Sequence, residues 1–192
     1  MKIVYYPHPS LRHKAVPLTA IDKKVHIHAG EMLELMRESK GLGLAGPQVF
    51  LPYQIFVVNR DTDPLMQPLE EVYLNPVIIE RKGTIEGEEG CLSFPDLYQK
   101  VRRAKTIKLQ AYNLKGEEVE TNVSDLPSRV LQHEVDHLHG TLFIDKYGPI
   151  AKLSARGRLK EFERKFRRAQ EKGEIQSDAD IERILKELEN QS

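Results

Sequence analysis

The 192-residue chain contains one cysteine, no excess charge of either sign and few aromatic residues. A single cysteine cannot form a disulfide within the chain, which favours a reducing compartment. Lysine and arginine (29 residues) balance aspartate and glutamate (29 residues), and aromatic residues make up 7% of the chain. The overall composition therefore indicates no general affinity for nucleic acid or membranes.

Long hydrophobic segments are missing as well. No apolar run approaches the roughly 20 residues that a membrane-spanning helix needs, and the opening MKIVYYPHPS lacks the hydrophobic region of a signal peptide. No period of roughly 20–50 residues repeats along the chain. We therefore expect a cytoplasmic protein with one core-forming domain and room for a small appendage.

The most informative stretch is QHEVDHLHG, residues 132–140. At about 100° per residue in a helix, His133 and His137 project from one face, one turn apart. Two imidazoles so placed can hold one metal ion, while Glu134 beside them is free to transfer protons. We favour this interpretation over a solvated helix that carries two histidines by chance. The residues suited to capping, opening and ending this helix are Ser124 or Asp125, Pro127 and Gly140.

The third metal ligand is less obvious. A catalytic site usually has three protein ligands and leaves one position for water, which then loses a proton more easily than bulk water. The metzincin motif is excluded because Phe143 stands where its last histidine would be. A downstream glutamate, Glu161 or Glu163, would complete a zinc-peptidase site, although both fall in a strongly charged predicted helix. The other candidate is Cys91, within EEGCLS.

Three segments together resemble the signature motifs of the bacterial peptide deformylases. They are GLGLAGPQ (residues 41–48), EGCLS (residues 89–93) and QHEVDHLHG. The resemblance extends from the opening YPHPSLR to about Ile150. It departs from the usual motifs at Gly46, where a second alanine is common, and at His8, where an acidic residue is common.

The resemblance implies a metal-dependent hydrolase that removes the formyl group from the N-terminal formylmethionine of newly synthesised polypeptides and releases formate. It implies one divalent ion, expected to be Fe²⁺, with Zn²⁺, Ni²⁺ or Co²⁺ also compatible with such ligands. The implied ligands are Cys91, His133 and His137. Glu134 would act as the general base, and the side-chain amide of Gln48 and the backbone N–H of Leu92 would stabilise the oxyanion.

Substrate-binding residues are expected around this centre. Leu126 and Val130 lie one to two turns before His133 on its helix face and are expected to line an apolar pocket for the methionine side chain. Gly43 offers backbone for strand-like pairing with the peptide, and Gly90 is assigned to substrate binding beside the cysteine. A phosphate-binding loop is disfavoured for GLGLAGPQ because no Lys-Ser/Thr ending follows.

Supporting residues are expected around the cysteine segment. Glu89 and Arg103 are candidates to hold this segment in place, although a surface ion pair of little energy is an alternative interpretation. Two further polar residues of the QHEVDHLHG stretch, Asp136 and His139, point away from the predicted metal face and receive no role.

The remaining pattern predicts an α+β fold in which antiparallel sheets pack around the central metal-binding helix, with a C-terminal helical extension. Thr19 is expected to cap a helix that ends at Gly41, with apolar residues on one face. Strands are expected at residues 54–59, twice within 71–90 with Pro76 forcing an edge or a bulge, and as a hairpin over 104–114 and 117–123. A polar loop is expected over residues 61–68.

After Ile150 the composition changes, which suggests a catalytic domain over residues 1–150 and an extension over 151–192. A basic helix is predicted from Ser154 to Lys172, and Ser177 is expected to cap a second helix with an apolar stripe. The stripe would pack on the main domain, on the preceding helix or on another subunit. The basic helix could contact the ribosome through RNA phosphates, although a solvated face is the preferred interpretation. Neither DNA nor a membrane is an expected partner.

Two functions compete with the hydrolysis of formyl groups. One is a zinc peptidase that uses the same helix with a glutamate as the third ligand. The other is a non-catalytic module in which the metal is structural. A structural site would be closed by four protein ligands, and the sequence offers only three good candidates.

Overall fold

The computed structural model describes residues 1–60 and 69–190. Its helices are α1 (Lys23–Glu38), α2 (Asp125–Leu138), α3 (Pro149–Glu171), α4 (Asp178–Glu189) and the short 3-10 helices η1 (Pro9–Arg12), η2 (Gly46–Val49) and η3 (Phe143–Lys146). Its strands are β1 (Gly43–Ala45), β2 (Ile55–Asn59), β3 (Glu70–Lys82), β4 (Ile85–Cys91), β5 (Phe94–Arg103), β6 (Thr106–Tyr112) and β7 (Glu118–Ser124). The loop expected over residues 61–68 lies outside the described residues.

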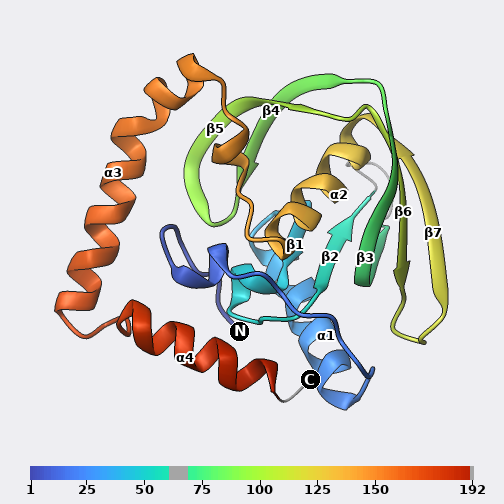
Figure 1. Cartoon of the computed structure of the whole chain (residues 1–192), viewed down its shortest axis with the longest axis horizontal. Coiled ribbons are helices and arrows are strands. Elements are labelled where there is room, and N and C mark those ends of the chain that lie inside the picture. Colours follow the sequence, from blue (N-terminus) through green and yellow to red (C-terminus); the bar gives the residue numbers. More distant parts are fainter. Residues whose placement is uncertain (61–68, 191–192) are drawn as a thin grey trace.

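The strands form two antiparallel sheets, and α2 lies between them (Figure 1). One sheet has five strands in the order β1-β2-β3-β6-β7, and the other is the hairpin of β4 and β5. This arrangement confirms the predicted α+β class. Strand β5 was not predicted, because its buried residues do not alternate regularly: Asp96 has a φ of 59°, and the next buried positions are Leu97 and Val101.

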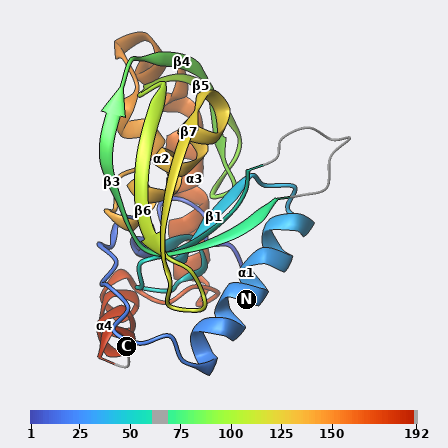
Figure 2. The ribbon, with the colours of Figure 1, turned by 90° about the vertical axis from the view of Figure 1, so that its right-hand side faces the viewer.

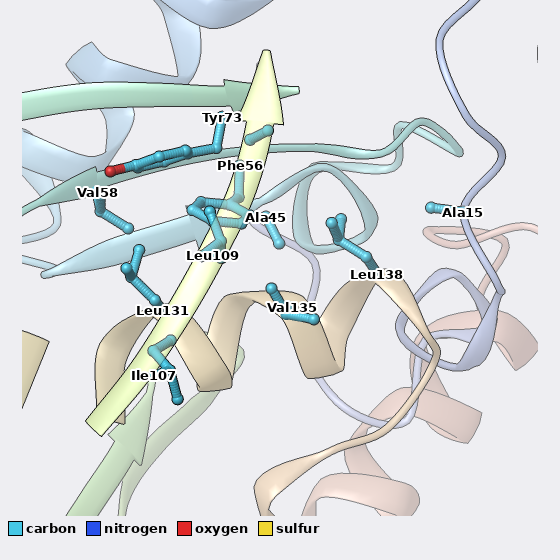
Figure 3. Close-up of a cluster of buried hydrophobic side chains, with 11 residues drawn as sticks. Ala15, Ala45, Phe56, Val58, Tyr73, Ile107, Leu109, Leu131, Val135 and Leu138 are labelled. Atoms are coloured by element: carbon cyan, nitrogen blue, oxygen red, sulfur yellow. The ribbon is translucent and has the colours of Figure 1, made fainter. Parts of the chain in front are cut away.

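Two helices cover opposite faces of the five-stranded sheet, and Figure 2 shows α1 standing apart from α2. Because successive side chains of a strand point to opposite faces, Phe56 and Val58 of β2 pack on the α2 side, whereas Ile55 and Val57 pack on the α1 side. Figure 3 shows the α2 side, where Leu131, Val135 and Leu138 meet the strands. The metal-ligand candidates therefore project from a helix whose opposite stripe is anchored in the core.

A bulge in β3 lies at the predicted proline. The pairing of β3 with β6 shifts register between Leu74 and Val77, and Pro76 lies within that interval. Asn75, with a φ of 49°, uses its side chain to bind both backbone groups of Leu18. Because proline cannot donate to a ladder hydrogen bond, an interior strand tolerates it only at such an irregularity.

Helix α1 begins later than predicted. Asp22, not Thr19, is its N-cap, and its side chain accepts a hydrogen bond from the N–H of Val25 at 3.0 Å. The Asn75 side chain holds the backbone of Leu18 in a non-helical segment, so the helix can start only after that contact. The prediction of Thr19 as the cap was therefore wrong, because a tertiary contact decides where the helix starts.

Strand β7 leads directly into α2, with Ser124 as the N-cap. Helix α2 ends at Leu138, and Gly140 follows in the left-handed region with a φ of 68°. A side chain at Gly140 would place its Cβ 2.4 Å from the backbone oxygen of Arg12. Both the backbone conformation and the close approach of the N-terminal segment therefore require glycine at this helix end.

The C-terminal helices fold back on the main body. Helix α3 begins at Pro149, five residues before the predicted start, and proline suits the first turn of a helix. The prediction missed this turn because Ile150 and Leu153 are exposed and give no apolar periodicity. Ser177 caps α4 as predicted. The buried residues Ile181 and Leu185 pack on α3, and α4 also lies against η1. Among the described residues, no helix combines the length and the apolar character needed to cross a membrane.

Leu131 tests the anchoring of α2, since its side chain is fully buried against the sheet. We expect Leu131→Ala to lower the free energy of unfolding by about 2–5 kcal/mol, because the change removes buried methyl groups and leaves a cavity. Ile150→Ala, at a position that is 86% exposed, should change it by less than about 0.5 kcal/mol. Equal effects of the two changes in urea denaturation would contradict the anchoring.

Candidate active site

Three candidate metal ligands converge where the end of β4 meets α2. Cys91 is the last residue of β4, and His133 and His137 lie one turn apart on α2. Their ligand atoms all lie within 4.8 Å of one another. The Nε2 atom of His137 lies 3.4 Å from Sγ of Cys91 and 3.2 Å from Nε2 of His133. Segments about 40 residues apart in the sequence thus supply one compact donor set.

This donor set fits a single cation. A thiol and two imidazoles are ligands that suit iron, zinc, nickel and cobalt. Burial lowers the pKa of His133, but hydrogen bonds to Cys91 and Glu89 outweigh it and raise that pKa to about 10. The surroundings therefore favour positive charge at this position. Burial, together with the charge of His133, holds the pKa of His137 well below its usual value, so its imidazole is neutral, the form that binds a metal ion.

The alternative glutamate ligands lie elsewhere. Glu161 pairs with Arg158 at 2.8 Å and Lys165 at 2.7 Å on α3. The carboxylate of Glu163 accepts a hydrogen bond from the hydroxyl of Tyr6 at 3.1 Å. In the described part of the chain, only the cysteine and the two histidines form a group of at least three potential ligands.

Glu134 lies beside this donor set and is almost completely buried. Burial raises the pKa of Glu134 to about 7, because an ionised carboxylate loses its hydration in this environment. Its Oε2 atom is buried and has no hydrogen-bond partner among the described residues. A buried carboxylate with a free oxygen and a pKa near neutrality is suited to accept and return a proton.

Gly43 explains how Glu134 can occupy this place. A Cβ at Gly43 would lie 2.3 Å from Oε1 of Glu134, so any side chain there would displace the carboxylate. Gly43 belongs to β1, which pairs with β2 on one side and forms an end strand of the five-stranded sheet. The glycine-rich segment was expected to bring backbone close to a substrate; its structure is strand β1 followed by η2.

Gln48, in η2, presents its amide to the same place. Its Oε1 accepts a hydrogen bond from the N–H of Ala45 at 2.8 Å. Because this contact fixes the orientation of the amide, the Nε2 donor faces the other way, 3.4 Å from Sγ of Cys91 and 3.3 Å from Oγ of Ser93. Ser93 was not identified from the sequence, since a lone serine carries no spacing signal.

A buried ion pair contacts His133, one of the candidate ligands. Arg103 donates from Nε to Oε1 of Glu89 at 3.0 Å and from Nη2 to Oε2 at 2.9 Å. The Oε2 atom also lies 3.3 Å from Nδ1 of His133. Burial opposes ionisation, but hydrogen bonds from His133 and Arg103 lower the pKa of Glu89 to about 2. The interpretation as a surface ion pair was wrong, since Arg103 and Glu89 are 5% and 9% exposed.

Asp136, which received no role from the sequence, completes this network. Its carboxylate accepts a hydrogen bond from Nη1 of Arg103 and lies 3.1 Å from Nζ of Lys146. On the other side of the network, Arg129 lies 3.5 Å from Glu89. Helical periodicity places Asp136 away from the metal face. Its part in the network follows only from the position of Arg103 on β5.

A cavity of about 490 Å³ opens beside these groups, a size typical of small-ligand sites. Leu126 and Val130 of α2 line it, as do Gly43, Gly90 and Leu92. A Cβ at Gly90 would lie 2.4 Å from the ring of Tyr98, so glycine allows the ring to sit at the cavity wall. The lining residues that the sequence did not indicate include Tyr5, Leu42, Tyr98 and Arg129.

Comparisons with known proteins agree on one family. The family model described as polypeptide deformylase matches residues 1–153. A peptide deformylase of Rhodopirellula baltica is 40% identical over 181 residues, which cover 94% of this chain and 90% of that protein. The crystal structure of a peptide deformylase from Arabidopsis thaliana is similar with a TM-score of 0.84 and 36% identity, covering 91% of this chain and 95% of that one. One from Plasmodium falciparum has a TM-score of 0.82 and 36% identity, covering 86% and 97%.

Glu89→Gln tests whether the ion pair supports the candidate ligand His133. The change keeps the shape of the side chain but removes the charge that orients the imidazole, so we expect Zn²⁺ affinity to fall by about 10–100-fold. Competition with a chromophoric chelator measures this affinity. Glu86→Gln is the matched control, because Glu86 lies on the same strand in an exposed pair with Arg102 at 3.9 Å. An unchanged affinity in Glu89→Gln would show that the ligand needs no such support.

Proposed function

The chain belongs to the peptide deformylase family, and from this premise we propose how its own residues carry out the family's reaction. The enzyme is a hydrolase that removes the formyl group from the N-terminal methionine of newly synthesised polypeptides. The convergence of one cysteine, two histidines and a buried glutamate at the wall of a single cavity is the observation that carries the proposal.

One metal-ion site serves the reaction, and we assign Cys91, His133 and His137 as its ligands. Their three ligand atoms would leave a fourth position for the reactants, as catalytic sites require. When bound, the ion would polarise the formyl carbonyl and make water beside it more acidic. Fe²⁺ is the proposed ion; Zn²⁺, Ni²⁺ and Co²⁺ suit the same ligands.

Glu134 is proposed as the group that moves the proton. Its carboxylate takes a proton from the attacking water, whose oxygen forms a bond to the formyl carbon. The C–N bond then breaks, and Glu134 returns the proton to the departing amine of methionine, which leaves formate as the other product. The raised pKa of Glu134, caused by burial, supports both halves of this role.

Two donors are proposed for the oxyanion that develops on the formyl oxygen. One is Nε2 of Gln48. The hydrogen bond from the N–H of Ala45 to Oε1 of Gln48 directs this Nε2 toward the proposed ligand Cys91. The other is the backbone N–H of Leu92, which follows Cys91 and lines the cavity. Such fixed donors stabilise the transition state more than the substrate because they are already oriented before reaction.

The cavity is proposed to receive the methionine side chain. Leu126 and Val130 give its wall an apolar character that suits an unbranched thioether chain. Gly43 lies on an end strand of its sheet, so the substrate backbone can add there as a further strand. Gly90 contributes backbone beside Cys91, and its lack of a side chain leaves room for the ring of Tyr98.

Residues 1–150 are proposed as the catalytic domain and 151–192 as a helical extension, a division supported by the end of the family match at residue 153. The basic residues of α3 are proposed to contact ribosomal RNA, which would bring the enzyme to its nascent substrates. A location in the cytoplasm is proposed because its reducing environment would protect a ligand cysteine from oxidation.

Formate release from a formyl-Met tripeptide under anaerobic conditions tests the proposed chemistry. We expect the Fe²⁺-loaded enzyme to release formate from this peptide and none from the unformylated peptide. Glu134→Gln should retain its metal but lose turnover by at least about 100-fold, since an amide cannot accept the proton. Full turnover in this variant with metal retained would require another general base.

A further inference from the structure

The C-terminal helices return to the main body directly behind the segment that carries Gln48. In Figure 1, α4 runs from the end of α3 back toward the N-terminal segment. Ile181 and Leu185, 0% and 1% exposed, form one apolar cluster with Phe166 of α3. Phe50 packs against this cluster. Phe50 is the C-cap residue that follows η2, two positions after Gln48.

The backbone at Phe50 is in a conformation that needs outside support. Its φ is 64°, in the left-handed region that bulky L-residues rarely adopt. Such a conformation persists only where the surrounding structure holds it. The Phe50 ring packs against the C-terminal cluster, and the Phe50 N–H donates to the backbone oxygen of Pro47 at 3.4 Å.

The N-terminal segment joins the same contact. The ring of His8 lies edge-on to Phe50, with centroids 5.2 Å apart, and edge-on to Phe166 at 6.0 Å. Burial lowers the pKa of His8 to about 4, so the ring is neutral among these apolar neighbours at physiological pH. The hydroxyl of Ser10 then donates to the backbone oxygen of Pro47 at 2.6 Å.

The far end of α4 is fastened beside the start of η2. The hydroxyl of Tyr53 donates to the backbone oxygen of Leu188 at 2.6 Å, and Nε2 of His13 lies 2.7 Å from Oε1 of Glu189. A Cβ at Gly46 would lie 2.8 Å from the backbone oxygen of Tyr53. His8 and Gly46, the two positions where the chain departs from the usual motifs, thus both belong to the junction between η2 and α4.

We infer that α3 and α4 form a brace that positions the Gln48 amide for catalysis, acting through Phe50. This inference rests on the oxyanion-binding role proposed above for Gln48. The side-chain amide of Gln48 is held by the N–H of Ala45, which donates to its Oε1, and the backbone of Gln48 is held by the N–H of Val4, which donates to the Gln48 carbonyl oxygen at 2.8 Å. When the cluster on α4 is emptied, Phe50 can leave its left-handed conformation and carry η2 with it. Leu185 is therefore a positioning residue, although it lies outside the cavity.

Leu185→Ala in the full-length, metal-loaded enzyme tests the brace. We expect kcat for a formyl-Met tripeptide to fall by about tenfold, within the range up to about 100-fold that a 1 Å misplacement can cause. KM and Zn²⁺ affinity should stay close to the wild-type values, because neither the cavity nor the ligands change. Leu185→Met, which keeps the volume, should restore kcat. If Leu185→Ala does not fold, Leu185→Val should show the same pattern at smaller size.

The same change in a Gln48→Ala background separates positioning from general destabilisation. Gln48→Ala alone should lower kcat by about 100–1000-fold, and adding Leu185→Ala should lower it little further, because the amide to be positioned is gone. Val123→Ala, on the opposite edge strand β7, serves as a control for lost core packing and should leave kcat unchanged while the protein is folded.

Three results would overturn the brace. One is an unchanged kcat in folded Leu185→Ala. Another is an equal loss of kcat when Leu185→Ala is made in the wild-type and in the Gln48→Ala background. Both results leave the proposed role of Gln48 intact. The third is a wild-type kcat in Gln48→Ala, which would remove the oxyanion role and the brace together. The single variant therefore shows which of the two proposals has failed.

Discussion

The buried ion pair between Arg103 and Glu89 is the interaction on which the rest of the site depends. Glu89 lies two residues before Cys91, and its second oxygen faces His133, while Arg103 reaches on to Asp136 of α2. In the described residues, the hairpin of β4 and β5 shares no ladder with the five-stranded sheet. The charged network therefore joins the strand that brings the cysteine to the helix that brings the histidines.

Burying such a network is costly unless every charge is paired. Here two carboxylates, of Glu89 and Asp136, share the guanidinium of Arg103. Arg129 approaches Glu89 and Lys146 approaches Asp136, so each carboxylate has a second cation nearby. The pKa of Glu89, lowered to about 2 against the effect of burial, shows that hydrogen bonds to the ionised form outweigh the loss of hydration. The ionised Glu89 lies 3.3 Å from Nδ1 of His133, while Nε2 of the same ring faces His137 at 3.2 Å.

The parts of the fold that follow from local spacing were predictable. His133 and His137 are one turn apart, and the hairpin of β6 and β7 closes at Gly116, whose φ is 78°. What could not be predicted depends on distant partners. The cap of α1 shifts because Asn75 holds Leu18, and Asp136 gains its role only from Arg103 on another strand. The exposed start of α3 gave no periodic signal, so its first turn was missed.

The central claim is that Cys91 and the two histidines of α2 bind one ion. The most direct measurement is the absorption spectrum of the protein loaded with Co²⁺ under anaerobic conditions. The wild-type chain should bind one Co²⁺ and show an intense near-ultraviolet charge-transfer band from the thiolate, and Cys91→Ala should lack that band and bind the ion more weakly. A spectrum without the band in the wild-type protein, or an identical spectrum in Cys91→Ala, would contradict the claim.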